Sequence, residues 1–373
     1  MEIKAIKLPF RLKKSILALG SQTKNTTCFA KGNFAYLSSM HADLNNPGDF
    51  LIFIKSINRF LKKNPNIIAC DLHPEYQSSK YAHRFLASKF KLFPIQHHHA
   101  HIAACMADNA LNNQRVIGVA FDGTGLGIDN TLWGAEFLVC NYKSFIRKAH
   151  LKEIPLLGGE RAILEPWRLA AFWLYLVYKD KFLKLDIDFM KRMNKNKWQF
   201  LKKMYEKKIN TPLTTSMGRL FDAAASLILA KERANFEAEL AMQLEKIATG
   251  YRLQATGYEF KIIKQKDKYI IDPSLIFKGI VSDLKKDERK ERIAYRFHLS
   301  IAEMIRKTSL ILRKETAISN IVLAGGVFQN KLLGKITSDL LHQENFKVFT
   351  HNKLSCNDSG LSLGQAVIAG MRN

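Results

Sequence analysis

The chain has 373 residues, more than the roughly 250–300 residues at which a single hydrophobic core usually stops growing, so two lobes are expected. Hydrophobic residues make up 47% of the sequence, and no uncharged apolar run reaches about 18 residues, which excludes a membrane-spanning helix. The formal net charge of +25 would suit nucleic acid, but the lysines are spread over many segments without a nucleic-acid-binding motif. We interpret this charge as a solvated surface; an acidic protein partner or an anionic substrate would also fit it.

Five cysteines stand far apart and form no C-x-x-C pair, so neither a zinc ribbon nor a disulfide framework is expected. Residues 1–15 mix basic residues with short apolar patches and lack the features of a signal peptide. We therefore expect a cytoplasmic protein that has no membrane segment.

The first third of the chain is predicted to consist of short strands alternating with helices. The predicted strands cover residues 15–19, 27–30, 33–38, 67–71 and 93–96, and the predicted helices cover residues 49–61, 76–88 and 97–109. Lys31 and Gly32 are predicted to form the hairpin turn between the second and third of these strands.

A second set of strands begins at residues 116–121, breaks at a glycine-rich turn over residues 122–127 and resumes at residues 132–140. A mostly helical insertion is expected over residues 165–247, and the polar, Lys-rich segment 254–290 is expected to be a variable peripheral region. The remaining predicted elements are a helix over residues 292–313, strands over 321–323 and 346–350, and a helix over 362–371. Because a strand set opens each half of the chain, the pattern predicts a duplicated α/β architecture.

The strongest local signal for chemistry is the run of four histidines within residues 97–101. His97 and His101 are spaced i and i+4, so on a helix they share one face and can bind the same metal ion. Two imidazoles are an incomplete ligand set, and Asp122 and Asp358, each beside glycines near a predicted strand end, are candidates to complete it as an Fe or Zn site. The alternative is a histidine-rich helix start that binds no metal.

Two glycine-rich segments are candidates for binding a nucleotide. Asp122 is followed by Gly123, Thr124 and Gly125, whose backbone N–H groups can approach phosphate oxygens closely. Residues 325–326 form a glycine pair between a buried strand and a helix, a geometry that accepts ribose or phosphate. In isolation, a tight hairpin and a plain strand-to-helix turn explain these segments nearly as well, and an Asp N-cap would explain Asp358.

The order of these motifs along the chain is more specific than any one of them. With the residues around them, they make the chain resemble the C-terminal carbamoyltransferase part of the HypF family of hydrogenase-maturation proteins. The matching blocks are LGSQTKNTTC (19–28), CDLHPEYQSSKYA (70–82), IQHHHAHIAACMA (95–107), VAFDGTGLGIDNTLWGAEF (119–137), GGERAILEPWRLA (158–170), TSMGRLFDAAASL (215–227), LAGGVFQNKLL (323–333) and NDSGLSLGQA (357–366).

The resemblance implies a two-lobed fold of the actin/hexokinase/acetate-kinase (ASKHA) class, with duplicated mixed sheets, a helical insertion and nucleotide between the lobes. On this basis we expect an N-terminal lobe of residues 1–112 and 360–373, which carries the metal-binding helix. Residues 113–359 would form the C-terminal lobe with the nucleotide loops. The wider family includes the tRNA threonylcarbamoyl transferase TsaD and the antibiotic O-carbamoyltransferase TobZ.

The resemblance also implies roles for individual residues. The implied metal ligands are His97, His101, Asp122 and Asp358. The implied nucleotide-binding residues are Asn25, Gly123, Thr124, Gly125, Gly325, Gly326 and Asn330. Lys24, in the hairpin that faces the phosphates in this fold, and Arg168, Arg219 and Asp222, in blocks that line the cleft with Glu165, are the implied catalytic residues.

HypF-like enzymes carry a carbamoyl-adenylate to this cleft, where a thiolate at the C-terminus of the partner HypE attacks the carbamoyl carbon and AMP leaves. The resemblance therefore implies ATP, AMP or carbamoyl-adenylate and an Fe or Zn ion as cofactors, with Mg as a further candidate, and a HypE-like acceptor as partner. The family's adenylate-forming YrdC-like domain has no counterpart in this sequence, so we expect a separate YrdC-like protein to supply the adenylate.

The chain departs from the family pattern at two places: residues 236–239 read Phe-Glu-Ala-Glu instead of Tyr-Glu-Gly-Gln, and residues 158–160 read Gly-Gly-Glu instead of Gly-Gly-Asp. Alternative functions are therefore kept open. They are a TobZ-like O-carbamoyltransferase for a small-molecule hydroxyl, a non-catalytic nucleotide-binding partner, and a TsaD-like tRNA-modifying enzyme, the last disfavoured by the closer match of the blocks to HypF.

Overall fold

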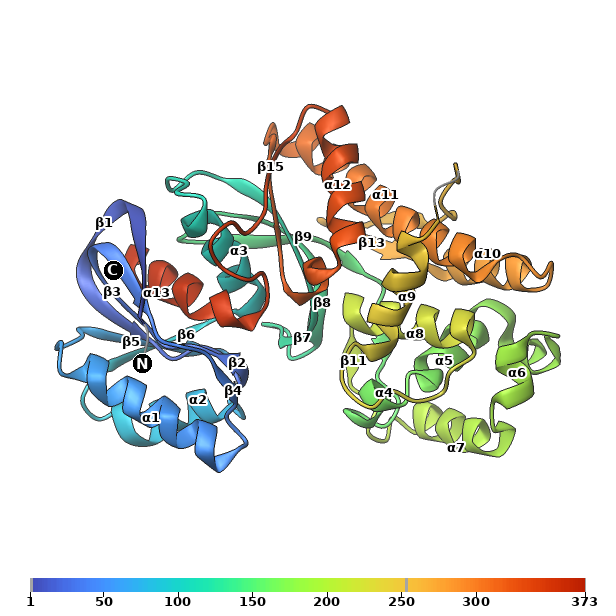
Figure 1. Cartoon of the computed structure of the whole chain (residues 1–373), viewed down its shortest axis with the longest axis horizontal. Helices are drawn as coiled ribbons and strands as arrows, with labels where there is room; N and C mark the ends of the chain where they lie inside the picture. The colour runs from blue at the N-terminus through green and yellow to red at the C-terminus, as the bar shows by residue number, and fades with distance from the viewer. Residues whose placement is uncertain (1–2, 252–253, 373) are drawn as a thin grey trace.

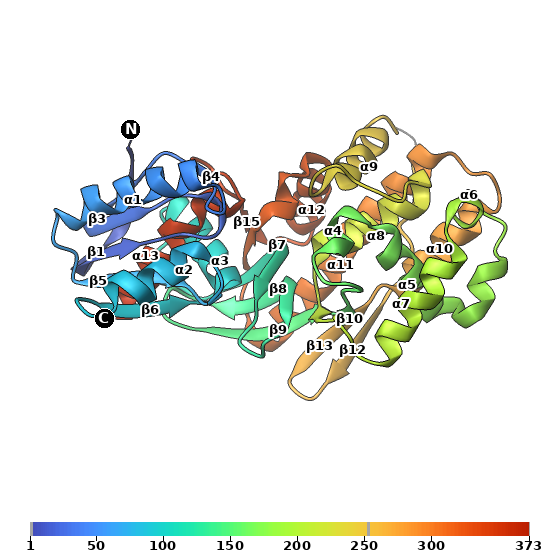
Figure 2. The same ribbon diagram turned by 90° about the horizontal axis from the view of Figure 1, so that it is seen from below.

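A computed structural model describes residues 3–251 and 254–372 of the chain. Two mixed sheets form the framework, with one helix-rich region at the end of the molecule away from the first sheet (Figure 1, Figure 2). The predicted mixed α/β class is confirmed. No helix in the described ranges combines the length and the apolar character needed to cross a membrane.

The first sheet has the strand order β3-β1-β5-β6, with β1 antiparallel to β3 and the other pairs parallel. Its strands are β1 (Lys4–Ala18), β3 (Cys28–Leu37), β5 (Ile67–Asp71) and β6 (Lys91–Ile95). Side chains alternate between its faces. Leu17 and Ile68 pack toward α1 (Pro47–Leu61), whereas Ile16 and Ala69 pack toward α13 (Leu361–Met371).

Smaller elements complete this end of the molecule. A short ribbon pairs β2 (Thr23–Asn25) with β4 (His41–Asp43), and α2 (Gln77–Tyr81) continues into the π-helical turn η1 (Ala82–Leu86).

The second sheet has the order β12-β13-β9-β8-β7-β14-β15. Its strands are β7 (Val116–Leu126), β8 (Leu132–Cys140), β9 (Phe145–Leu151), β12 (Lys261–Gln265), β13 (Lys268–Asp272), β14 (Asn320–Ala324) and β15 (Lys347–Phe349), and β10 (Ile154–Pro155) and β11 (Leu213–Thr214) attach beside β8. In both sheets the first strand lies centrally, with an antiparallel hairpin partner on one side and two parallel strands on the other. This shared topology is the duplication that the strand pattern predicts.

The helix α3 (His97–Asp108) lies between the two sheets (Figure 1). All twelve of its residues are buried, since it packs against α13 and the first sheet on one side and against β7 and β14 on the other. The packing is close: a Cβ added at Gly118 of β7 would lie 2.3 Å from Ile102. Residues on α3 are therefore fixed relative to both halves of the molecule.

The helix-rich region packs around α8 and α11, whose apolar faces belong to the largest core cluster (Figure 2). Its elements are α4 (Arg161–Leu164), α5 (Trp167–Tyr178), η2 (Lys179–Lys184), α6 (Asp188–Arg192), α7 (Lys195–Glu206), α8 (Met217–Leu229), α9 (Glu239–Thr249), α10 (Ser274–Leu284) and α11 (Lys290–Thr316). The C-terminal part adds η3 (Gly326–Gln329), α12 (Lys331–Gln343) and η4 (Asp358–Gly360).

Two predicted turns prove to lie inside strands. Lys31 and Gly32 form no hairpin, because β3 runs through them and Gly32, with φ of 60°, takes up a register shift opposite Leu12 of β1. The glycine-rich segment after Phe121 likewise stays in β7 as an irregularity in its pairing with β8, and the turn comes later, where Gly127 N donates to Thr131 O.

The segment 254–290 is not peripheral, so that prediction is wrong. It forms β12, β13 and α10; β13 pairs in parallel with β9, and Ile271, Phe277 and Ile280 are buried in the core. The many lysines in this segment made its buried apolar positions hard to recognise in the sequence. They become clear once the pairing of β13 with β9 is known. The assignment to the ASKHA class and the lobe boundaries at 112/113 and 359/360 stay predictions.

Candidate functional site

Four side chains that are far apart in the sequence converge on one small volume. His97 and His101 direct their Nε2 atoms toward Oδ2 of Asp122, at 3.3 and 3.1 Å. The same nitrogens lie 3.7 and 3.4 Å from Oδ1 of Asp358. One ligand atom from each residue lies within 4.8 Å of the others. The structure thus brings together all four residues predicted as metal ligands, and we call them the His–Asp cluster.

Three elements carry the His–Asp cluster. His97 and His101 lie one turn apart at the start of α3. Asp122 lies within β7. Asp358 begins η4, where the Asn357 side chain accepts a hydrogen bond from the Ser359 N–H. The prediction that Asp122 lies at the end of its strand is therefore wrong, because β7 continues past it to Leu126, and Asp358 follows β15 only after a loop.

Asp71, the last residue of β5, supports the His–Asp cluster from beneath. Its Oδ2 accepts a hydrogen bond from Nδ1 of His97 at 2.8 Å, and its Oδ1 accepts the N–H of His73 at 2.9 Å. Because a carboxylate only accepts hydrogen bonds, Nδ1 of His97 carries the proton and Nε2 is left to face the other ligands. Such a carboxylate behind a histidine is a common feature of metal sites.

Charge balance within the His–Asp cluster outweighs the cost of burial. Burial disfavours protonation of His97, but Asp71 and Asp358 raise its pKa well above the usual value. At His101 burial is likewise overcome, chiefly by Asp122, and the pKa is raised. The two imidazoles hold the pKa of Asp122 well below its usual range although burial opposes this. A metal ion would therefore displace protons from the histidines on binding.

The donor set fits a transition-metal ion. Two imidazole nitrogens and two carboxylate oxygens suit Fe²⁺ or Zn²⁺. Bonds of about 2.0–2.2 Å to a tetrahedral ion would separate neighbouring ligand atoms by about 3.3–3.6 Å. The nitrogen–oxygen distances in the His–Asp cluster run from 3.1 to 3.7 Å. The histidine side chains are only 1% exposed, whereas that of Asp358 is 20% exposed, so the cluster opens to solvent on the Asp358 side.

Asp122 links the His–Asp cluster to both glycine-rich segments. While Oδ2 faces the histidines, Oδ1 accepts the N–H of Gly123 at 2.9 Å and the N–H of Gly326 at 3.1 Å. These two N–H groups therefore point at Asp122 rather than outward, contrary to the expectation that they face a phosphate directly. Thr124 follows in the same segment and is half-buried.

Two glycines allow the close packing that this arrangement needs. A Cβ at Gly125 would lie 2.8 Å from His98 and 2.9 Å from His97. Gly325 has φ of 98°, and a Cβ there would lie 2.3 Å from the carbonyl oxygen of Phe121. Both positions thus serve the approach of β7 and β14 to the His–Asp cluster.

Arg219, in the first turn of α8, lies behind Gly123. Ser216, the N-cap of α8, donates to the carbonyl of Gly123, and Glu237 accepts a hydrogen bond from Nη2 of Arg219 at 3.2 Å. The Arg219 side chain is 1% exposed, yet its Nη1 and Nε have no hydrogen-bond partner among the described residues, although Nε lies 2.9 Å from Asp222 Oδ2. A buried guanidinium with donors to spare is suited to an anionic ligand.

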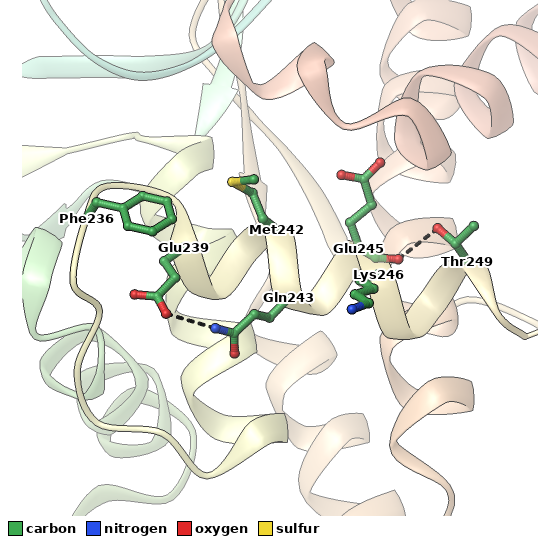
Figure 3. A pocket seen from close by; sticks show the side chains of 7 residues that line it. All are labelled: Phe236, Glu239, Met242, Gln243, Glu245, Lys246 and Thr249. Atoms are coloured by element: carbon green, nitrogen blue, oxygen red, sulfur yellow. Dashed lines mark hydrogen bonds between the residues drawn. The ribbon is translucent and has the colours of Figure 1, made fainter.

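A surface hollow of about 610 Å³ borders the same region, and Figure 3 shows its side chains along one face of α9 and the segment before it. The lining residues are Phe236, Glu239, Met242, Gln243, Glu245, Lys246 and Thr249. Glu245 accepts the N–H groups of Lys331 and Leu332, which fixes α9 against the start of α12, directly after η3 and its glycine pair. Phe236 and Met242 are 54% and 59% exposed, so an apolar surface is available to a ligand.

Two predicted nucleotide-binding asparagines have structural partners. Asn25 is fully buried; its amide donates to the carbonyls of Leu19 and Ser21, and its Oδ1 pairs with His41. Asn330 caps α12 by accepting the Leu333 N–H, and its amide contacts His298. Both side chains therefore stabilise local structure. To contact a nucleotide directly, each asparagine would have to break the hydrogen bonds that it makes within the protein.

Lys24 and Arg168 occupy different surroundings. Lys24 is exposed and belongs to β2. This strand lies against η4, the element that carries Asp358. Arg168 lines another hollow of about 410 Å³ with Phe200 and Lys197, and its guanidinium is held by Glu165 and by the Leu157 carbonyl. The described contacts do not join Arg168 to the His–Asp cluster.

Sequence reasoning missed several residues around the His–Asp cluster. Asp71 ends a buried strand. An aspartate at the end of a predicted strand was the reason for choosing Asp122, and the same reason would have identified Asp71. His73 and Tyr76 follow it with rings stacked 4.3 Å apart, and Tyr76 lies edge-on to His97 at 6.5 Å. Their proximity depends on the loop after β5, which no short-range pattern reveals.

Comparison with known proteins gives two matches to family profiles that together span most of the chain. Residues 11–108 match the HypF Kae1-like domain, and residues 118–365 match the second subdomain of the carbamoyltransferase, Kae1-like domain.

Individual relatives agree with these matches. Carbamoyltransferase HypF2 of Cupriavidus necator is 32% identical over 99% of this chain and 48% of its own length. A carbamoyltransferase HypF homolog of the same organism is 32% identical over 95% of this chain and 91% of its own length. A crystal structure of full-length HypF in the phosphate- and nucleotide-bound form is 40% identical, with a TM-score of 0.92, over 98% of this chain and 47% of that one. The chain thus spans about half the length of most of the curated relatives that it matches.

Proposed function

The chain belongs to the HypF carbamoyltransferase family, and on this premise we propose that it transfers a carbamoyl group from carbamoyl-adenylate to the C-terminal cysteine of a HypE-like partner. The transfer would serve NiFe-hydrogenase maturation. The observation that carries the proposal is the His–Asp cluster, with its Asp122 bonded to both glycine-rich segments. A metal site and a nucleotide site are then adjacent and share a residue.

We propose that the His–Asp cluster holds an Fe or Zn ion. Bound there, the ion would supply Lewis-acid polarisation of a carbamoyl or phosphate oxygen. His97, His101, Asp122 and Asp358 are the ligands, and Asp71 orients His97. Solvent and substrate would approach from the side of Asp358, where the cluster is exposed and where β2, which carries Lys24, lies against η4.

The nucleotide is proposed to lie between the His–Asp cluster and the α9 hollow. Arg219 has buried donors without partners beside Gly123, and Phe236 and Met242 offer an apolar surface for a base. The size of the hollow suits a small-molecule ligand. The related full-length HypF structure, described as phosphate- and nucleotide-bound, supports this part of the proposal. Mg²⁺ would accompany the phosphates.

The attacking thiolate is proposed to come from the partner, because burial raises the pKa of every thiol in this chain. The pKa of Cys70 and of Cys140 is raised to about 12, and that of Cys356, the least buried, to about 11. Cys28 and Cys105 are also shifted upward. In the transfer step the partner's sulfur bonds to the carbamoyl carbon, the bond from that carbon to the AMP oxygen breaks, and AMP leaves with the electron pair.

A YrdC-like protein or domain is proposed to make the adenylate. The test would combine this chain with such a protein, carbamoyl phosphate, ATP and a HypE-like acceptor, and would follow the acceptor by intact-mass spectrometry. We expect a gain of one carbamoyl group that disappears when the acceptor's C-terminal cysteine is replaced by alanine. Hydroxyl compounds offered in place of the acceptor would test the O-carbamoyltransferase alternative.

His97→Ala and His101→Ala are expected to lose both bound metal and transfer while staying folded, as judged by circular dichroism. Asp339→Asn removes an exposed carboxylate from α12 and is the matched control. Survival of metal content and turnover in both histidine variants would show that the His–Asp cluster is not the site.

A further inference from the structure

Asp108, the last residue of α3, binds the loop that precedes Asp358. Its Oδ2 accepts the backbone N–H groups of Asn352, Lys353 and Leu354 at 2.7, 3.0 and 3.1 Å, and its Oδ1 accepts that of Lys353 at 3.1 Å. The carboxylate is thus enclosed by three consecutive backbone donors. We call residues 350–357 the ligand loop, since it joins β15 to the η4 turn that begins with Asp358.

An aspartate at this position is unfavourable for the helix itself. The C-terminal end of a helix carries partial negative charge, which repels an acidic side chain placed there. The side chain is also 0% exposed, which adds a cost of desolvation. His351, whose Nδ1 lies 3.5 Å from Oδ2, and the three backbone donors offset both costs, and they lower the pKa of Asp108 although burial opposes this. The contact with the ligand loop is therefore what makes a buried aspartate favourable at this position.

Other contacts tie the start of the ligand loop and the end of β15 to the C-terminal end of α3. The Asn109 side-chain amide donates to the Thr350 carbonyl at 2.7 Å, and the Cys105 thiol approaches the Phe349 carbonyl at 3.8 Å. Along α3, His97 and His101 therefore face Asp358, whereas the following turns hold the chain that leads to it. One helix carries two of the metal ligands and grips the loop that delivers a third.

We propose that Asp108 is a positioning residue, which holds the ligand loop on α3 and so keeps Asp358 at ligand distance from the two histidines. This inference rests on the proposed metal site and adds a residue beyond the four ligands. Without this contact Asp358 would still be held by the Thr26 hydroxyl at the Ser359 carbonyl and by the Asn357 amide at Gln329, but the ligand loop would lose its attachment to α3. Supporting groups of this kind commonly contribute 10–100-fold to metal affinity.

The test measures Zn²⁺ affinity by competition with a chromophoric chelator. Asp108→Asn, which is nearly isosteric and places an amide against the donors, is expected to bind Zn²⁺ about 10–100-fold more weakly than the unaltered chain. Asp108→Ala should be at least as weak, and Asp339→Asn should match the unaltered chain. In an Asp358→Ala background, Asp108→Asn is expected to cause no further weakening, because the residue acts through Asp358.

A second measurement needs no metal. Hydrogen exchange of the metal-free chain should show protected amides at residues 352–354, and Asp108→Asn should lose that protection while the amides of α11 keep theirs.

Equal weakening by Asp108→Asn with and without Asp358 would overturn the proposal, since Asp108 would then act on the fold in general. Retained protection at residues 352–354 in the variant would also overturn it. Failure of the metal site itself has a different signature: the unaltered chain would bind no Zn²⁺ at all, while the exchange result would still decide whether Asp108 holds the loop.

Discussion

Asp222 is a buried carboxyl group whose nearest cation is poorly aligned with it. Arg219 Nε lies 2.9 Å away, yet Asp222 Oδ2 accepts no hydrogen bond from any described residue. Burial is the main reason that the pKa of Asp222 is raised to about 6; Glu237 adds to the shift and Arg219 opposes it. The residue was expected to be catalytic, but its surroundings first predict a dependence of stability on pH.

Because the folded-state pKa of about 6 lies above the ordinary value of 3.8, the folded state holds this proton more tightly than the unfolded state. The resulting stabilisation is complete below about pH 4 and is lost as the pH rises through about 6, by about 3 kcal/mol in all. Asp222→Asn stays neutral, so its stability relative to the unaltered chain should increase by up to this amount between about pH 4 and pH 7.

Urea unfolding of both proteins across this range measures the difference, in which the titration of all other groups cancels. A difference that does not change with pH would mean that Arg219 keeps Asp222 ionised in the folded protein. The buried ion pair would then be complete without a ligand, and the case for an anion beside Arg219 would weaken.

At the same scale, the sequence predicts side chains that act through a fixed spacing better than those that act through distant partners. His97 and His101 are a helical turn apart in any helix, and their shared face could be predicted. The engagement of Asn25 with His41 and of Asn330 with His298 could not, because these partners are set by packing between separate elements. Both asparagines were assigned to the nucleotide by resemblance alone.

Among the elements, α3 and α13 make the contact that fixes the metal-ligand helix in place. A Cβ at Gly364 of α13 would lie 1.8 Å from the carbonyl oxygen of Ala100 on α3. Gly364→Ala must therefore push the helices apart, and we expect it to lower the free energy of unfolding by about 1–3 kcal/mol or more.

Gly334→Ala is the matched control, since Gly334 lies within α12 and a Cβ there would meet no atom within 4 Å. That change is expected to stabilise the protein by about 0.5–1 kcal/mol. Chemical denaturation measures both changes. If the two variants were equally stable, the close approach of α3 and α13 would not exist in solution.

The elements also show why strand and turn predictions succeeded unevenly. Residues 67–71 were predicted as a strand and form β5, because five consecutive buried residues suit a parallel strand with both faces covered. At Gly32 and over residues 122–125, glycines read as turns accommodate strand irregularities, and only the partner strand distinguishes the two. The sequence around β9 gave no such clear signal, and its strand was not predicted.

For the whole molecule, the His–Asp cluster is the place where remote parts of the chain meet. Asp71 comes from the first sheet, Asp122 from the second, the histidines from the helix between them, and Asp358 from near the C-terminus. The order of motifs and the resemblance predicted that the four ligand residues meet, but not that Asp71 joins them, and the boundaries of the two lobes stay predictions. A ligand held by all of these parts would stabilise them together.

A metal ion bound at the His–Asp cluster should therefore raise the temperature of unfolding of the whole chain. At a free concentration 100 times its dissociation constant, a ligand specific for the folded state adds about 2.7 kcal/mol, which for a chain of this size corresponds to a rise of several degrees. Differential scanning calorimetry with Zn²⁺, and again after chelation, measures the shift. His101→Ala should show none, whereas Asp339→Asn should show the full shift.

Because the pKa values of both histidines are raised, the metal must compete with protons, so the shift should shrink as the pH is lowered. A shift of equal size in His101→Ala would locate the stabilising ion elsewhere on the protein.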